Sequence, residues 1–255
     1  YLRDMVTGRT TRVSLEQDQK TPANPFAEHP DISADGRYIV FASDDPKIAN
    51  GDPNAVRDVF RRTVATGATV LVTKPMKGGS DAGPSDFPTI SGDGHAVTFE
   101  SDSKLVPGDA NNQRDVYVAN LANHTQRIAS RTAGNAQING PSRRPWISAD
   151  GQRVAFVTPA DAVVPGDGNA LDDVFVRDLG ARTTTWASQG AGDAATFPTI
   201  SGNGRSVAFL VAGGGHLDNG DGNAKTDGYV RVLAHPSDSR KPTIAFAGAF
   251  AVLGA

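Results

Sequence analysis

Four loops of this sequence carry acidic and amide side chains at a spacing that suits a calcium ion. Each loop reads Asp-x-Asn-x-x-x-Asp and follows a glycine. Oxygen atoms at alternate positions of a tight loop, completed by backbone carbonyls, are how calcium loops gather their ligands. The spacing is shorter than that of an EF-hand loop, and no glutamate closes it. The candidate metal ligands are Asp52, Asn54, Asp58, Asp109, Asn111, Asp115, Asp167, Asn169, Asp173, Asp221, Asn223 and Asp227.

The same loops also have an interpretation that needs no metal. Aspartate and asparagine side chains accept hydrogen bonds from the backbone of their own turn, and the last aspartate can fix the start of the next strand. Duplicated units would repeat such a turn in every copy. The sequence leaves two interpretations open, calcium as the cofactor of these loops or a turn without metal.

The residues that most often build an active site are scattered along the chain. The five histidines occupy unrelated positions and form no zinc-binding pair. The absence of cysteine excludes a thiol nucleophile and a Cys-ligated zinc site. Trp146 and Trp186 lie inside strand motifs, which favours the core over a sugar-stacking platform. We therefore predict no catalytic residues, although carboxylates from different repeats could still meet in one pocket.

The four loops belong to a repeat that covers most of the chain. Its copies begin at Pro30, Pro88, Pro145 and Pro198, which are 58, 57 and 53 residues apart. This period lies slightly above that of WD and kelch propeller blades and is too long for helical solenoids. The repeat therefore indicates a propeller.

Each copy of the repeat predicts four strands. The first is short and ends in Ile-Ser, and the Asp-Gly or Asn-Gly that follows suits a two-residue hairpin turn with positive φ. The second is apolar on both faces, as in a sheet packed between neighbouring sheets. The third begins after the last aspartate of the loop, and the fourth is polar and threonine-rich, which suits an outer edge. We predict an all-β fold, a β-propeller of four-stranded blades.

The two ends of the chain resemble parts of the repeat. Residues 1–15 match its third and fourth strands, and residues 242–255 match its first and second strands. We predict that they complete one split blade, so that residues 1–255 form a single domain of five blades without open edges. Two alternatives remain for the C-terminal run. Residues 242–247 could be the fourth strand of the last repeat, or the run could be the stub of a membrane anchor; it is shorter than the ~20 residues needed to span a bilayer.

Charge and composition exclude some partners. The formal net charge is −3, and no segment gathers basic residues, so we expect no nucleic acid partner. We also expect no insertion into a membrane. The lack of cysteine does not fix the compartment, because exported proteins can lack it too.

The motifs P-x-I-S-x-[DN]-G-x-x-[VA]-x-F and D-V-[FY]-V-R-D resemble the WD-like propeller repeats of the TolB-like superfamily. The resemblance extends over nearly the whole chain. It implies a propeller that serves as a platform for protein interactions in the bacterial envelope, and hence an extracellular or cell-envelope location. Similar propellers also cap the active sites of prolyl peptidases.

These observations lead to one expected function and two alternatives. We expect a non-enzymatic, exported scaffold that binds a protein or peptide on its loop face, where variable loops stand on a rigid frame. The first alternative is a calcium-dependent, lectin-like module that binds carbohydrate. The second is a propeller glycosidase or lyase, which needs two carboxylates, or a carboxylate and a histidine, facing each other in one pocket.

Overall fold

The computed structural model describes residues 1–23, 26–52, 54–213, 217, 225–233 and 244–246. The chain divides into two compact units, Tyr1–Ala129 and Ser130–Ala255, and each is described by itself. All of the regular structure described is β-strand, in antiparallel sheets. The predicted all-β class and the four-stranded sheets are confirmed. A single closed ring concerns the arrangement of the two units and stays a prediction.

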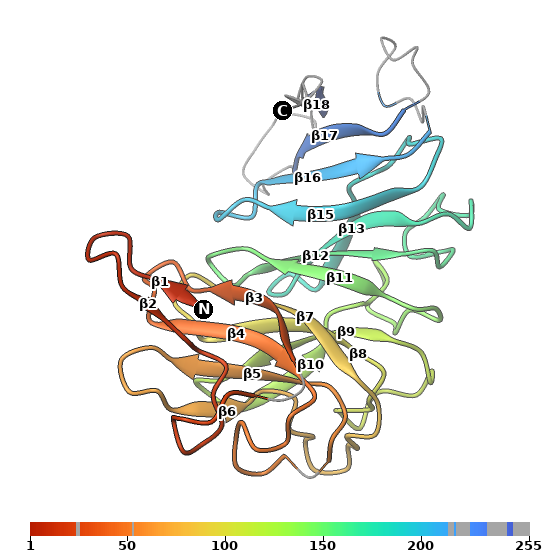
Figure 1. The fold of residues 1–255 in the computed structure, drawn as a ribbon. Helices are drawn as coiled ribbons and strands as arrows, with labels where there is room; N and C mark the ends of the chain where they lie inside the picture. Colours follow the sequence, from red (N-terminus) through yellow and green to blue (C-terminus); the bar gives the residue numbers. More distant parts are fainter. Residues whose placement is uncertain (24–25, 53, 214–216, 218–224, 234–243, 247–255) are drawn as a thin grey trace. The chain divides into compact units, whose positions relative to one another are not determined.

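Unit 1 contains two four-stranded sheets and a small hairpin (Figure 1). The hairpin pairs β1 (Leu2–Arg3) with β2 (Thr10–Thr11). The first sheet consists, in order, of β3 (Ala27–Ile32), β4 (Tyr38–Ser43), β5 (Asp58–Thr63) and β6 (Thr69–Leu71). The second sheet consists of β7 (Ser85–Ile90), β8 (Ala96–Ser101), β9 (Asp115–Asn120) and β10 (Thr125–Ile128).

Unit 2 repeats this organisation with two further sheets, each in sequence order. The third sheet consists of β11 (Arg143–Ile147), β12 (Arg153–Thr158), β13 (Asp173–Asp178) and β14 (Thr183–Trp186). The fourth sheet consists of β15 (Ala195–Ile200), β16 (Ser206–Val211), β17 (Asp227–Val232) and β18 (Ile244–Phe246). The predicted threonine-rich fourth strands β6, β10 and β14 lie at sheet edges, as expected.

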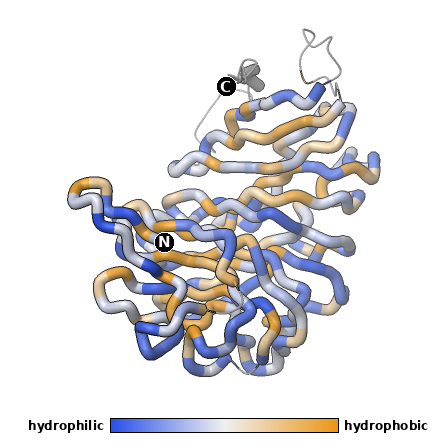
Figure 2. The backbone as a smooth tube through the Cα atoms, viewed as in Figure 1, coloured by the Kyte–Doolittle hydropathy of each residue, from blue (hydrophilic) through white to orange (hydrophobic). Residues whose placement is uncertain are grey.

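Three of the second strands, β4, β8 and β12, are buried on both faces, as the sequence predicts, whereas Leu210 of β16 is 37% exposed. In β4, Ile39 and Phe41 pack on one side of the sheet, and Val40 packs against the second sheet on the other. Figure 2 shows the hydrophobic residues concentrated along such strands. Each sheet also carries one aromatic pair across its two middle strands, such as Phe156 and Phe175, whose ring centroids are 6.0 Å apart. This packing between layers fixes the frame that carries the site.

The turn after each first strand differs from the predicted two-residue hairpin. In the first sheet, Ser33 pairs with Tyr38 across four intervening residues, and Gly36 N–H donates to the Ser33 carbonyl at 2.9 Å. Only the glycine has positive φ, at 69°. The Ser33 hydroxyl donates to Asp35 at 2.7 Å, so the polar side chains close the turn and no second left-handed residue is needed.

The C-terminal segment pairs with the last sheet. In β18, Ile244 lies opposite Arg231 and Phe246 opposite Tyr229, so this strand follows β17 at the sheet edge. That is the arrangement of the alternative in which the segment forms the fourth strand of the last repeat. Residues 247–255, which would complete the predicted split blade with residues 1–15, lie outside the described residues.

Candidate functional site on the first strands

Every first strand contains a β-bulge at the same repeat position. In β3 the bulge falls between Glu28 and Asp31, and it recurs in β7, β11 and β15. A proline lies inside each bulge, and because proline has no N–H to give to the ladder, a bulge is where a strand accepts it. The sequence analysis placed each proline at the start of its repeat, whereas the strands begin two or three residues earlier.

The residue before each of these prolines is in the left-handed backbone conformation. The four residues, here called the bulge residues, are His29, Phe87, Arg144 and Phe197, with φ between 49° and 52°. A non-glycine residue in this region costs roughly 1 kcal/mol, and such strain clusters at functional positions. All four bulge residues are aromatic or cationic side chains of the kind that dominates recognition surfaces.

In unit 1 the two bulge residues stack on each other. The rings of His29 and Phe87 have centroids 3.9 Å apart. His29 Nδ1 also lies 2.7 Å from a carboxylate oxygen of Asp86, and 36% of the His29 side chain is exposed. Because strands β3 and β7 lie side by side, two bulges form one continuous surface.

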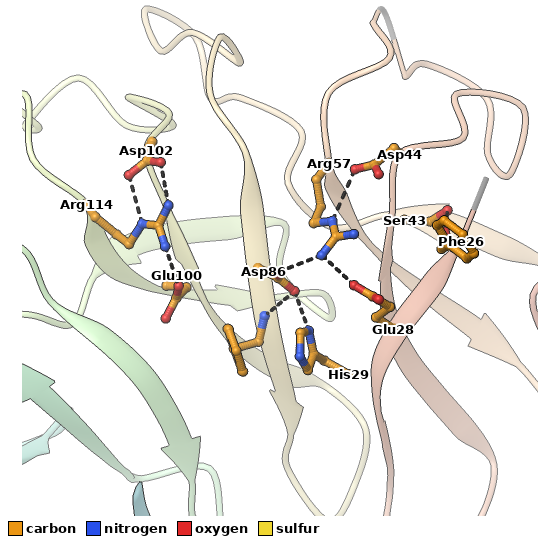
Figure 3. A network of polar contacts seen from close by, with 11 residues as sticks. Phe26, Glu28, His29, Ser43, Asp44, Arg57, Asp86, Glu100, Asp102 and Arg114 are labelled. Atoms are coloured by element: carbon orange, nitrogen blue, oxygen red, sulfur yellow. Dashed lines mark hydrogen bonds and ion pairs between the residues drawn. The ribbon is translucent and has the colours of Figure 1, made fainter. Parts of the chain in front are cut away.

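Arg57 ties this surface to the loops of the first sheet (Figure 3). Its guanidinium donates to Glu28 at 2.7 Å, Asp86 at 2.9 Å and Asp44 at 3.1 Å. Burial alone would lower the pKa of Arg57, but these carboxylates outweigh it and raise that pKa above its usual range. Since Glu28 and Asp86 both accept from the same cation, the network is better suited to holding a surface in place than to acid–base catalysis.

The second sheet has its own version of this network. Arg114 occupies the same repeat position as Arg57. It pairs with Glu100 at 2.7 Å and with Asp102 at 2.6 Å (Figure 3). In the third sheet the charges are exchanged, because Arg143 takes the place of Glu28 and pairs with Asp172, which takes the place of Arg57. The pairing persists while the sign at each position reverses.

In unit 2 the bulge residues form a cation–π pair. The Arg144 guanidinium carbon lies 3.9 Å from the centroid of the Phe197 ring, and Phe197 is 56% exposed. Trp146 on β11 is 41% exposed, so the prediction that it belongs to the core is wrong. The bulge offset at Pro145 explains this, since it changes the face toward which the following residues point.

The asparagines of the Asp-x-Asn loops make turns of the predicted kind. Asn54, Asn111 and Asn169 each accept, through their side-chain oxygen, the N–H of the residue two positions on, at 2.7, 2.9 and 3.0 Å. Asp52 does the same for Asn54, at 3.0 Å. The metal-free interpretation therefore accounts for these atoms.

The first and last aspartates of the loops bind neighbouring parts of the same sheet. The last ones, Asp58 and Asp173, accept from Thr73 and from Ser188 respectively, which joins the start of the third strand to the end of the fourth. Asp115 is buried at the same position. Among the first ones, Asp109 accepts from the Tyr117 hydroxyl, and Asp167 accepts the Val163 N–H at 3.3 Å.

One loop gathers more negative charge than the others. Burial raises the pKa of Asp58 to about 7, with Asp81 and Asp52 adding repulsion, although the Thr73 hydroxyl lowers it. Burial likewise raises the pKa of Asp52 and of Asp81. The Asp58 Oδ2 atom is buried and has no hydrogen-bond partner.

Calcium binding by these loops stays a prediction. Within the described parts of the chain, no three His, Cys, Asp or Glu side chains are grouped so as to hold a metal ion. Asp227 begins β17. Asp221 and Asn223 lie outside the described residues, so the fourth loop is not placed.

Sequence reasoning missed the bulge residues altogether. The signal was present, because a proline inside an otherwise apolar strand predicts a bulge or an edge. A proline two residues before the isoleucine of each Ile-Ser, preceded by a ring or a cation, would have identified them. No helix in the described chain is long and apolar enough to cross a membrane.

The solved structures most similar to this chain include β-propellers. TolB from Acinetobacter baumannii is 14% identical with a TM-score of 0.49, and the match covers 87% of this chain and 43% of that one. The β-propeller domain of the Trilobed protease from Pyrococcus furiosus is 13% identical with a TM-score of 0.48, over 87% and 57%. Acylaminoacyl peptidase from Pyrococcus horikoshii is 14% identical with a TM-score of 0.44, over 87% and 32%.

The chain thus spans less than two thirds of the length of each of these solved chains. Its structural neighbours are TolB and other propeller domains at low sequence identity. No protein-family model and no curated protein matches the sequence. At this identity the likeness concerns the fold, and the function has to come from the site itself.

Proposed function

We propose that this protein is a non-enzymatic scaffold that binds a protein or peptide through its bulge residues, on the surface of His29 and Phe87 in unit 1 or on that of Arg144 and Phe197 in unit 2. The observation that carries the proposal is the bulge itself, which recurs in all four first strands and displays a ring or a cation each time. The left-handed backbone of the four bulge residues lowers the stability of the protein in every repeat. Presenting these side chains to a ligand explains why the strain is kept.

The chemistry of the bulge residues supports a peptide ligand. Exposed aromatic rings supply contact area with little loss of side-chain entropy, and arginine supplies directed hydrogen bonds. Phe197 and Trp146 are exposed, and the Glu28, Asp86 and Arg57 network beside His29 offers both signs of charge for polar contacts. The proposal includes the cell envelope as the compartment, on the resemblance of the repeat motifs to TolB-like propellers.

Selection from a displayed library of random peptides, followed by titration of the enriched peptide, tests this function. Phe197→Ala and Phe87→Ala should each weaken binding about tenfold, as expected for a central aromatic contact. Val70→Ala is the control, because Val70 is an exposed apolar residue on the outer strand β6. A library that yields no binder, or a binder whose affinity neither phenylalanine variant changes, would contradict the proposal.

A further inference from the structure

One repeat position on the third strands holds a cation in three of the four sheets. It is occupied by Arg62 in β5, Arg177 in β13 and Arg231 in β17, and by Ala119 in β9. The residue opposite it on the fourth strand is Thr69, Thr184 and Ile244 for the three arginines, and Gln126 for Ala119. The cross-strand pair therefore varies as a unit.

In the first and third sheets the arginine is buried and donates hydrogen bonds to other groups inside the protein. Arg62 is 7% exposed and donates to Thr69 at 3.2 Å and to Gln19 at 2.5 Å. Arg177 is 3% exposed and donates to Thr184 at 3.1 Å and to the Thr132 carbonyl at 3.3 Å. In both, the threonine opposite supplies a hydroxyl, and an incoming loop supplies the rest.

In the second sheet the donor is the side-chain amide of Gln126, on the fourth strand β10. Gln126 Nε2 donates to the backbone carbonyls of Val72 at 2.7 Å and Lys74 at 3.0 Å. In these three sheets the position thus binds the preceding segment through donors that meet internal acceptors.

Arg231 departs from this pattern. Its ladder partner is Ile244, where the first and third sheets have a threonine. Arg231 donates to the carbonyls of Trp186 at 2.9 Å and Gln189 at 3.2 Å, while its Nε atom is buried with no hydrogen-bond partner. No carboxylate in the described chain pairs with it, and a buried donor left unmatched on a cation is an unfavourable state that calls for an acceptor.

A cavity of about 500 Å³ lies at this arginine, within unit 2. Arg231, Arg153 and Asp178 line it, and Arg153 is paired with Asp178 at 3.1 Å, so the charge of Arg231 is left over. Burial lowers the pKa of Arg231, which is the direction an unpaired cation takes when it leaves water. Among the described residues, the cavity therefore carries one positive charge that no carboxylate neutralises.

The rest of the lining combines hydroxyl and amide groups with an aromatic ring and with apolar side chains, which are Val164, Pro165, Val176, Ala181 and Leu233. The side chains of Thr183, Thr185 and Gln189 are exposed at the cavity, and each can both donate and accept hydrogen bonds. Trp186 lines the cavity between them, with its indole N–H held by Asp173 at 2.8 Å. A lining of this kind matches a small molecule that is rich in hydroxyl groups, and the volume is within the range of small-ligand sites.

We propose that the Arg231 cavity binds a sugar acid, a small polyhydroxylated molecule whose carboxylate pairs with Arg231 and whose hydroxyl groups meet the threonines and Gln189. The site is distinct from the bulge residues and does not depend on the function proposed for them.

Calorimetric titration of the full chain with D-glucuronate, D-glucose and inorganic phosphate tests the site. D-glucuronate should bind in about the millimolar range, and D-glucose should bind at least about tenfold more weakly, because it lacks only the carboxylate. Equal binding of the two sugars, tighter or equal binding of phosphate, or no binding of D-glucuronate would overturn the proposal.

Three variants assign the binding to the cavity. Arg231→Gln should reduce D-glucuronate affinity about tenfold or more, whereas Arg205→Gln, which removes an exposed charge from the same unit, should leave it unchanged. Thr185→Val removes one hydroxyl without touching the charge and should weaken D-glucuronate by about threefold. Unchanged affinity in both Arg231→Gln and Thr185→Val would overturn the assignment, and the second variant keeps the test open if the first does not fold.

Discussion

Arg177 and Arg231 occupy the same repeat position in the two sheets of unit 2, yet their surroundings differ. Arg177 is almost completely buried and meets a threonine hydroxyl and a loop carbonyl. Arg231 is half-buried, faces Ile244 across the ladder and lines a cavity. The two sheets have the same side chain at this position, and it is buried against internal acceptors in one and lines a cavity in the other.

Methionine substitution at these two arginines should give the largest difference. Arg177→Met leaves the buried Thr184 hydroxyl and the Asn135 side-chain oxygen without the guanidinium N–H groups that they accept, so the free energy of unfolding should fall by about 2–3 kcal/mol. Arg231→Met should lower it by less than about 1 kcal/mol, since Arg231 donates only to two backbone carbonyls close to a cavity. Urea unfolding of both variants measures the difference, and equal losses would remove the distinction between the two sites.

The turn glycines Gly36 and Gly94 provide a second pair of equivalent positions. Both have positive φ, but a Cβ at Gly36 would meet nothing within 4 Å, whereas one at Gly94 would lie 2.1 Å from the Tyr38 ring. Gly94→Ala should therefore cost about 2 kcal/mol of stability, against about 1 kcal/mol for Gly36→Ala, which carries the backbone strain alone. Thermal melting of both variants checks the order, and a Gly36→Ala variant that is the less stable of the two would refute it.

Asp58 should make the stability of the protein depend on pH. Its pKa is raised to about 7 in the folded state, above the value of an unfolded aspartate, so the folded state binds more protons between these values. Stability is therefore fully present at low pH in this range and falls as pH rises through 7. Between pH 5 and pH 8, the wild type should lose on the order of 1–2 kcal/mol more than Asp58→Asn does.

Asp81 contributes part of this effect by repulsion, and nothing acidic stands at its repeat position in the next two loops, where Ile138 and Ala191 are found. Asp81→Asn should accordingly flatten the pH dependence in part. Chemical unfolding at several pH values measures both changes. The same pH dependence in the wild type and in Asp58→Asn would show that another group is responsible.

The exchanged ion pair of the third sheet should give the smallest effect. Arg143 and Asp172 reverse the charges of Glu28 and Arg57, and both side chains are partly exposed, so solvent screens their attraction. A double-mutant cycle with Arg143→Ala and Asp172→Ala should return a coupling energy of about 0.5–1 kcal/mol. The coupling should shrink when salt is added, and a coupling that grows with salt would contradict an electrostatic origin.

The sequence predicted the frame of the molecule well because burial and turn chemistry are local. Continuous apolar runs such as Tyr38–Ser43 can only be strands buried on both faces, and the Ser33, Asp35 and Gly36 turn is specified by its own side chains. The sequence analysis missed the first-strand bulges because it placed the start of a repeat at Pro30, whereas β3 begins at Ala27. The exposure of Trp146 followed from the same omission, since a bulge changes which face a residue occupies.

The contacts of the candidate sites were not predictable from one sequence. His29 and Asp86 are separated by 57 residues, and only the pairing of two sheets in unit 1 brings them to 2.7 Å. The surroundings of Arg231 likewise depend on the pairing of the last strand, for which the sequence left alternatives open. The calcium prediction for the Asp-x-Asn loops rested on residue type and spacing, which metal ligands and turn residues share.

The side-chain Nε–Hε resonances of the arginines give the most direct test of the difference between Arg177 and Arg231. NMR spectra recorded during a titration with D-glucuronate should show the Arg231 resonance moving to saturation, because a carboxylate at the guanidinium changes the surroundings of its Nε–H group. The Arg177 resonance should stay in place, because its donors are already used inside the fold. If both resonances move together, or if only that of Arg177 moves, the two arginines do not differ in the way their surroundings indicate.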